Sequence, residues 1–327
     1  MESLLSHFKF GQFEFVLRTL DSIRLPAYKG STIRGGFGHA FKKVVCVNKD
    51  KVCESCLLKG KCVYSYIFET PPPSDTLKMR KYPYAPHPFV ITPPLEEKRT
   101  YREGDTLCFE LTLIGRSIDF LPYFIYTFDE LGRVGIGKGR GKYQLEEIRA
   151  ILPCKKSEDQ GEKGSILYSG KEKILHSSYK AVAIEDLIPS RLTPDTLRLK
   201  FLTPTRLKYD GQLSPTLEFH ILARNLLRRI SLLSYFHCEK QLELDFKGLI
   251  EEAKDVKVQK GNLHWLDWER YSNRQDTKIK MGGFIGSITF EGGFKEFLPF
   301  LILGEYIHVG KGTSFGLGKY KILSFES

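Results

Sequence analysis

The stretch GSTIRGGFGHAFKKVV, Gly30 to Val45, carries side chains that could move protons and hold phosphates. At helical spacing its apolar residues fall on one side, while Gly35, His39, Lys42 and Lys43 fall on the other. An imidazole can act as general acid or base near neutral pH, and an ammonium group stabilises charge on a phosphate. Gly35 leaves room beside His39 for a bulky ligand. An ordinary solvated helix face is the alternative.

Four cysteines follow this stretch as C-x6-C-x2-C-x5-C: Cys46, Cys53, Cys56 and Cys62. A C-x-x-C pair flanked by two more thiols can enclose one tetrahedral zinc, so we expect a structural zinc that clips a long insertion. An iron–sulfur cluster would use the same thiolates and stays open as an alternative, as does an empty, vestigial cluster. Disulfides are a poorer explanation in a cytosolic chain.

Glycines gather again near the C-terminus, in HVGKGTSFGLGKY, at Gly310, Gly312, Gly316 and Gly318. Glycines let backbone N–H groups converge on an anion, which favours a phosphate site. The spacing is not the G-x-G-x-x-G of dinucleotide-binding proteins. A second segment, GRVGIGKG, has the P-loop frame but places Gly139 where Ser or Thr should bind magnesium, which disfavours an ATPase.

The two glycine segments belong to an internal duplication. Leu121–Tyr143 and Leu298–Tyr320 have the same length and both begin with Leu-Pro, at an offset of 177. This offset places Gly135, Gly139 and Gly141 on Gly312, Gly316 and Gly318.

Periodicity predicts the same order of strands and helices in each half. Two βα units per half, with room for one more strand, favour a ferredoxin-like βαββαβ domain, and therefore an α+β protein of two tandem domains. We expect domains at 1–155 and 191–327, a linker at 156–190, and a four-cysteine insertion at about 46–95. The predicted elements are strands at 12–19, 106–114, 142–148, 196–203, 283–290 and 319–325, and helices at 31–45, from 121, at about 216–236 and from 298, with Ser31 or Thr32 capping the first helix.

Charge and composition point to a polyanionic partner. The 327 residues carry a net charge of +11, and 41% of them are hydrophobic, enough for two cores. The segment HWLDWERYSNRQDTKIKMGG interleaves aromatic residues with basic ones, which suits unstacked bases and phosphates, although an ordinary basic hairpin would look the same. No apolar run is long enough to span a bilayer and no signal peptide is evident, so we expect a cytoplasmic protein without a membrane partner.

Several motifs together resemble a known family. They are LPAYKGSTIRGGFGHAF, the cysteine segment ending in CVYSYIFETPPP, YAPHPFVITPP, LTLIGRSIDFLPYFIYTFDELGRVGIGKGRGKY, RYSNRQ and HVGKGTSFGLGKY. The chain thereby resembles the CRISPR precursor-crRNA-processing endoribonucleases of the RAMP superfamily. The resemblance implies two ferredoxin-like (RRM-like) domains, a glycine-rich loop on the RNA backbone, and cleavage of CRISPR repeat RNA without a catalytic metal.

The resemblance also implies roles for single residues. His39 matches the histidine that commonly serves in catalysis on the first helix of the family, with Tyr28 sharing proton transfer and Lys42 stabilising the phosphorane. The 2′-hydroxyl would attack, leaving a 2′,3′-cyclic phosphate. Residues expected to bind RNA are Arg34, Lys43, Arg224, Arg228, Arg270, Arg274, Lys278, Lys280, His308, Gly310, Lys311, Gly312, Gly316, Gly318 and Lys319.

Two other functions remain consistent with the sequence. One is a non-catalytic crRNA-binding RAMP subunit of a CRISPR effector complex. The other is an unrelated, zinc-clipped nucleic-acid-binding protein.

Overall fold

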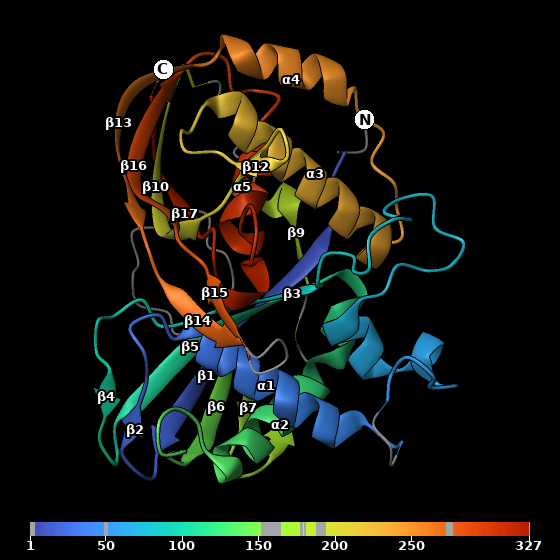
Figure 1. Ribbon diagram of the computed structural model, residues 1–327, viewed down its shortest axis with the longest axis vertical. Helices are drawn as coiled ribbons and strands as arrows, with labels where there is room; N and C mark the ends of the chain where they lie inside the picture. The colour runs from blue at the N-terminus through green and yellow to red at the C-terminus, as the bar shows by residue number, and fades with distance from the viewer. Residues whose placement is uncertain are drawn as a thin grey trace. The chain divides into compact units, whose positions relative to one another are not determined.

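The computed structural model describes residues 4–48, 52–151, 165–176, 179, 181–187, 194–272 and 277–326 (Figure 1). Within these residues the chain divides into two compact units. The first unit comprises His7–Ala183 and Leu232–Lys240. The second unit comprises Met1–Ser6, Ile184–Ser231 and Gln241–Ser327. No helix of the described chain is long and apolar enough to cross a membrane.

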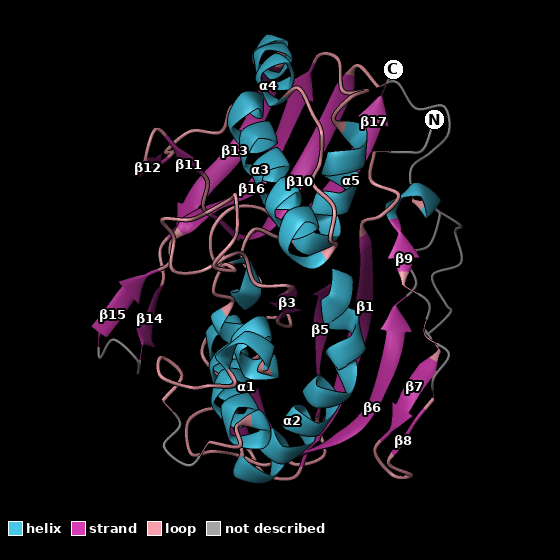
Figure 2. Cartoon of the chain, turned by 90° about the vertical axis from the view of Figure 1, so that its right-hand side faces the viewer, coloured by secondary structure: helices cyan, strands magenta, loops and turns pink. Residues whose placement is uncertain are grey.

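The first unit is a ferredoxin-like fold. Its central strands follow the order β3-β5-β1-β6 and pair antiparallel, and α1 and α2 pack on one face of the sheet (Figure 2). These elements are β1 (Lys9–Thr19), α1 (Gly30–Val45), β3 (Phe89–Thr92), β5 (Thr106–Ile114), α2 (Leu121–Val134) and β6 (Tyr143–Ile151). The additional elements are β2 (Ile23–Arg24), β4 (Thr100–Tyr101), β7 (Ile166–Ser169), β8 (Ile174–Leu175), β9 (Val182–Ala183), η1 (Lys59–Lys61), η2 (Ser65–Glu69) and η3 (Gly115–Phe120).

The second unit repeats this topology with the strand order β13-β16-β10-β17, again antiparallel. Its elements are β10 (Thr196–Thr205), α3 (Phe219–His237, of which the part up to Ser231 belongs to this unit), β13 (Lys257–Leu266), β16 (Gly283–Glu291), α5 (Leu298–Ile307) and β17 (Tyr320–Glu326). The additional elements are η4 (Ile184–Asp186), β11 (Lys208–Tyr209), β12 (Gln212–Leu213), α4 (Phe246–Asp255), β14 (Glu269–Ser272), β15 (Thr277–Lys280) and η5 (Thr313–Phe315).

The predicted α+β class with two tandem ferredoxin-like folds is therefore confirmed. The offset of 177 relates the first residues of three element pairs: β5 and β16 begin at 106 and 283, α2 and α5 at 121 and 298, and β6 and β17 at 143 and 320. The one further strand expected in each ferredoxin-like half is β3 in the first unit and β13 in the second, each at a sheet edge next to β5 or β16.

Two local expectations differ from the structure. The range 156–190, expected to be a linker, contains β7, β8 and β9, which extend the first sheet beside β6 and β1. The α1 helix begins at Gly30 with Lys29 as its N-cap, and neither Ser31 nor Thr32 caps it. Lys29 is fully buried and its Nζ donates to the Glu96 carbonyl at 2.6 Å, so a tertiary contact holds this helix end.

Aromatic packing fixes α1 against the first sheet. Phe37 stacks on Phe41 at 5.0 Å, on Phe124 of α2 at 4.8 Å and on Phe128 at 5.3 Å between ring centroids. From β1, Phe13, Phe15 and Leu17 reach the same core, as expected for alternate residues of a strand. This packing sets which face of α1 is buried.

The glycines of α1 serve different purposes. A Cβ on Gly38 would overlap the Phe68 ring, and one on Gly36 would press on Leu131 at 3.2 Å. A Cβ on Gly35 would meet nothing within 4 Å. Close packing therefore requires Gly38, whereas Gly35 stands on an open face.

The C-terminal glycine loop, His308–Lys319, is longer than its N-terminal counterpart because α5 ends early. α2 runs to Val134 and leaves eight residues (135–142) before β6, whereas α5 ends at Ile307 and leaves twelve (308–319) before β17. The chain turns at His308, whose φ is +61°, an unusual value for a residue with a side chain.

A buried arginine satisfies the carbonyl groups at this helix end. Arg229 of α3 is 8% exposed, and it donates to the Ile307 carbonyl at 3.0 and 2.8 Å and to the His308 carbonyl at 3.0 Å. Burial lowers the pKa of Arg229 to about 9, so it keeps its charge at neutral pH. The His308 ring is 1% exposed, and its Nδ1 lies 3.2 Å from the Leu317 carbonyl. The expected RNA contact by His308 is therefore not available to this side chain, which supports the loop from inside.

The first prediction contrasts two glycines of one helix. Gly35→Ala should raise the free energy of unfolding by up to about 1 kcal/mol, because alanine is the better helix former and its methyl group meets open space. Gly38→Ala should lower it by about 1–3 kcal/mol, because the methyl group displaces Phe68. Chemical denaturation of both variants measures the difference, and equal effects would contradict the packing described for α1.

The second prediction concerns acid stability. Burial, followed by the charges of Lys319 and Arg229, holds the pKa of His308 well below its usual 6.5. Because the unfolded chain then binds more protons, stability should fall as the pH drops below about 6.5, by up to about 1.4 kcal/mol per pH unit. His308→Asn, which tolerates the positive φ, should unfold with a shallower pH slope than the wild type. His176→Asn, at an exposed position, is the control and should keep the wild-type slope.

Candidate functional site

One face of α1 is free of packing. Phe37 and Phe41 point into the core, whereas Gly35, His39 and Lys43 are exposed and Lys42 is partly exposed. We call these four residues the α1 surface. A helix that buries an aromatic stripe must present the opposite stripe to solvent, so the core packing itself turns His39 outward.

His39 is available to a ligand. Among the described residues it has no hydrogen-bond partner and no ion pair, so both ring nitrogens can take part in proton transfer to a bound molecule. A Cβ at the neighbouring Gly35 would meet no atom of the described residues within 4 Å, so there is open space beside His39. The ammonium of Lys42 lies 5.3 Å from the centre of the Tyr64 ring, which restrains it one turn from His39.

Tyr28 precedes the first residue of α1 by two positions. Burial raises the pKa of the Tyr28 hydroxyl well above its ordinary value, so Tyr28 keeps its proton and is unsuited to act as a base.

Arg34 belongs to a cluster that the sequence did not reveal. Its guanidinium lies 4.2 Å from the centre of the Phe68 ring, and Nη2 lies 3.2 Å from Nε2 of His87. The other ring nitrogen of His87 lies 3.1 Å from the Thr70 hydroxyl. Arg34 is thus held in place by contacts from a loop far along the chain. The motif YAPHPF contains His87, but spacing alone does not connect it with α1.

The C-terminal glycine loop is a folded unit with its own hydrogen bonds. The amide of Lys311 donates to the Arg206 carbonyl at 3.0 Å, that of Gly318 to the Pro204 carbonyl at 3.1 Å, and that of Lys319 to the Thr203 hydroxyl at 2.8 Å. Gly310, Gly312, Gly316 and Gly318 all have positive φ. Several of the loop's N–H groups therefore shape the loop itself, and the side chains around it are the main groups left for a ligand.

The other basic residues expected to bind RNA are placed as follows. Arg224 and Arg228 are exposed on α3, and Arg224 lies 5.8 Å from the centre of the Tyr209 ring. Arg270 on β14 lies 4.7 Å from the centre of the Phe315 ring in the glycine loop. Lys280 is exposed on β15. Arg274 and the side chain of Lys278 lie outside the described residues.

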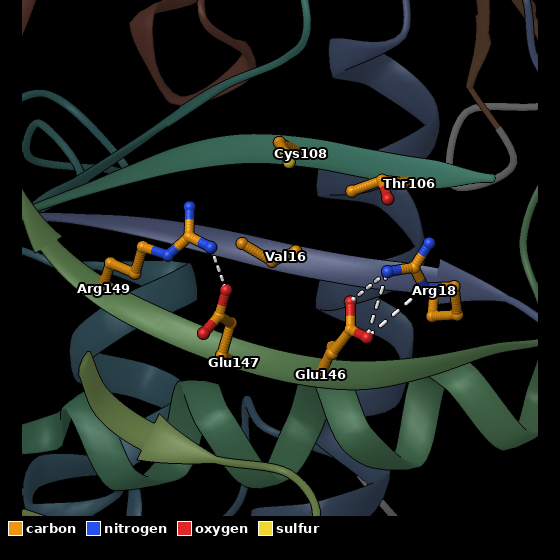
Figure 3. Close-up of a pocket in the computed structure, with 7 residues that line it drawn as sticks. All are labelled: Val16, Arg18, Thr106, Cys108, Glu146, Glu147 and Arg149. Atoms are coloured by element: carbon orange, nitrogen blue, oxygen red, sulfur yellow. Dashed lines mark hydrogen bonds and ion pairs between the residues drawn. The ribbon is translucent and has the colours of Figure 1, made fainter. Parts of the chain in front are cut away.

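The sheet face of the first unit opposite its helices carries a shallow pocket of about 460 Å³ (Figure 3). Its charged side chains form ion pairs with one another or with a neighbouring glutamate. Arg18 binds Glu146 at 3.1 Å, and Arg149 binds Glu14 at 3.1 Å and also Glu147. Val16 and Cys108 lie between them, and burial raises the pKa of the Cys108 thiol to about 11. RRM sheets bind RNA with aromatic side chains, and this pocket has none. Its carboxylates disfavour an RNA phosphate here.

The four clustered cysteines are described, and each is partly buried and unpaired. The Cys56 amide donates to the Cys53 carbonyl at 3.4 Å, and Cys53 and Cys62 pack against the core of the first unit. Across the described residues, no group of three or more His, Cys, Asp or Glu side chains is arranged to hold a metal. The zinc site remains a prediction from spacing.

Comparisons with known protein families match each half of the chain to a different family model. Residues 8–179, just over half of the chain, match the family model AF_1859_N, described as an N-terminal domain. Residues 199–320 match the model of the CRISPR-associated endoribonuclease Cas6. An uncharacterised protein of Archaeoglobus fulgidus is 25% identical over 310 residues, which cover 92% of this chain and 93% of that protein.

Solved structures share the fold along the whole chain. A Cas6 product complex has a TM-score of 0.57 at 18% identity, covering 96% of this chain and 99% of that one. Thermus thermophilus Cas6 has a TM-score of 0.53 at 17% identity, covering 97% and 99%. A chain of a partial Cas6-RT-Cas1–Cas2 complex has a TM-score of 0.57 at 15% identity, and the match covers 99% of this chain but 48% of that one.

The chain belongs to the family of the AF_1859_N model, which matches just over half of it, and its residues 199–320 match the Cas6 endoribonuclease model within a tandem ferredoxin-like fold that solved Cas6 structures share.

Proposed function

We propose that this protein is a metal-independent endoribonuclease that binds CRISPR repeat RNA and cleaves precursor crRNA. The observation that carries the proposal is His39, which is exposed and without a partner among the described residues, beside open space at Gly35. The Cas6 domain at 199–320 supplies the class of substrate. One of the structures that share the fold is named as a Cas6 product complex.

The proposed reaction uses a nucleophile that RNA itself provides. A general base removes the proton of the 2′-hydroxyl, the oxygen attacks the adjacent phosphorus, and the 5′-oxygen leaves with a proton from a general acid. The products are a 2′,3′-cyclic phosphate and a 5′-hydroxyl. His39 can take either proton-transfer role, and Lys42 can stabilise the negative charge on the phosphorane. The protein must then place the hydroxyl in line with the leaving oxygen.

We propose that basic residues of both units bind the repeat. Lys43 belongs to the α1 surface, and Arg34 lies on the same helix. Arg224, Arg228, Arg270, Lys280, Lys311 and Lys319 lie on the second unit, and Arg274 and Lys278 are proposed from the sequence. Lysines and arginines that displace counterions from phosphates supply affinity independent of sequence. Gly310, Gly312, Gly316 and Gly318 keep the loop free of bulky side chains. Subunits of a CRISPR effector complex are proposed as further partners.

The third prediction tests catalysis by His39. His39→Ala should slow single-turnover cleavage of labelled repeat RNA by about 10²–10⁴-fold, while the Kd for the RNA stays within about threefold of wild type. Excess EDTA should leave wild-type cleavage unchanged. A 2′-deoxy nucleotide at the scissile position should abolish cleavage, because the nucleophile is missing.

The matched control is His176→Ala, which removes another exposed histidine of the same unit and should cleave like wild type. Normal cleavage by His39→Ala would remove His39 from the mechanism. Tight binding without cleavage by wild type would instead identify a non-catalytic RAMP subunit. Binding without preference for the repeat would point to an unrelated nucleic-acid-binding protein.

We also propose that Cys46, Cys53, Cys56 and Cys62 bind one structural zinc. The support is the C-x6-C-x2-C-x5-C spacing together with the tight turn from Cys53 to Cys56. Four thiolates close the coordination sphere, so such a zinc would contribute to folding and leave no position for a substrate.

The fourth prediction concerns this metal. Elemental analysis should find one zinc per chain, and Cys56→Ser should lower Tm by several degrees because a closed site contributes folding energy. Cys108→Ser, at a thiol outside the cluster, should keep the zinc. Stoichiometric iron with visible absorbance would replace zinc with an iron–sulfur cluster, and a metal-free protein of unchanged Tm would contradict both.

A further inference from the structure

Arg206 is a partly buried cation whose surroundings do not neutralise it. It follows the last residue of β10, and its Nη1 contacts the sulfur of Met281 at 3.2 Å. Its Nε is buried and has no hydrogen-bond partner among the described residues. Burial lowers the pKa of Arg206, which reports the desolvation of the guanidinium. A desolvated donor without an acceptor is unfavourable, so this site is incomplete without an anion.

Two lysines stand beside Arg206. The Lys311 amide donates to the Arg206 carbonyl at 3.0 Å, which ties the glycine loop to the end of β10. Gly310 permits this approach, because its φ is +85° and a Cβ there would overlap the Arg206 carbonyl. Lys208 is two residues further along, and its carbonyl accepts from the Asn225 side chain at 3.1 Å, which holds β11 against α3.

The three side chains form a cationic group without a counter-charge. Among the described residues none of them takes part in an ion pair. Burial first, and then the charges of Lys208 and Arg206, lower the pKa of Lys311, so both charges act on the Lys311 ammonium. Like charges held together by the backbone repel one another unless an anion lies between them.

The chemistry of the group fits a phosphate. The arginine fork and two ammonium groups match the several oxygens of a phosphate. We infer that Arg206, Lys208 and Lys311 form a phosphate site that holds the RNA backbone beside the C-terminal glycine loop. The inference rests on the proposed function for the identity of the polymer, and it adds Arg206 and Lys208 to the binding residues.

A salt series with an uncleavable repeat RNA, 2′-deoxy at the scissile position, tests the site. Arg206→Gln and Lys208→Gln should each weaken binding by about 3–10-fold and reduce the slope of log K against log salt by about 0.7–0.9 per lost phosphate contact. Arg206→Lys keeps the positive charge but loses the forked guanidinium, so its affinity for the RNA should lie between those of the wild type and of Arg206→Gln. The variant with both substitutions should lose less binding free energy than the two single variants lose together, because both side chains bind one phosphate.

Lys247→Gln is the matched control, since it removes one exposed positive charge from α4 of the same unit and should keep the wild-type slope. Thermal unfolding checks that each variant is folded. If Arg206→Gln is unstable, the exposed Lys208→Gln decides the question.

The outcomes separate the site from the proposed function. Wild-type binding and slope in both variants would overturn the site, whether or not the wild type cleaves. A wild type that binds the repeat but does not cut it would overturn the proposed endoribonuclease activity. The affinities and salt slopes of the Arg206 and Lys208 variants would still decide whether the phosphate site exists. A wild type that binds no RNA would overturn both.

Discussion

The stacking of Phe37 between α2 and the first sheet is the contact on which the proposed catalytic centre depends. Phe37 meets Phe41, Phe89, Phe124 and Phe128 within 6 Å of its ring centre. Because large aromatic rings bury much apolar area, rotation of α1 about its axis would expose them. His39 is two residues further along the helix, so the same packing holds it outward. The core packing thus orients an exposed residue.

The second unit meets a different constraint, the early end of α5. Ending the helix at Ile307 leaves carbonyl groups without their helical partners, and Arg229 satisfies them from inside. A charged donor makes stronger hydrogen bonds than a neutral one, which offsets part of its desolvation. The longer loop that results lies beside Arg206 and carries Lys311. The two units therefore share one fold, but the early end of α5 makes the C-terminal glycine loop longer than its N-terminal counterpart.

The charges of the protein are distributed unequally between its surfaces. In the sheet pocket of the first unit, Arg18 and Arg149 are neutralised by glutamates. On the α1 surface and around the glycine loop, the described lysines Lys43, Lys208 and Lys311 take part in no ion pair. A polyanion therefore gains more from the helix and loop surfaces than from the sheet. This distribution departs from the RRM mode of binding, which uses aromatic residues of the sheet.

Sequence periodicity and the internal repeat determined the fold class, the starts of β5, α2, β6 and their counterparts, and the outward face of His39, because these follow from local spacing. Tertiary structure decided what local spacing does not contain. Lys29, and not the expected serine or threonine, occupies the N-cap position, and its side chain donates to the Glu96 carbonyl. The His308 side chain is buried beneath the glycine loop. His87 contacts Arg34, and the Arg206 carbonyl accepts from the Lys311 amide, so both contacts join residues far apart in the chain. Burial and partner choice depend on such long-range contacts, so the sequence could suggest the functional residue types but could not place these side chains.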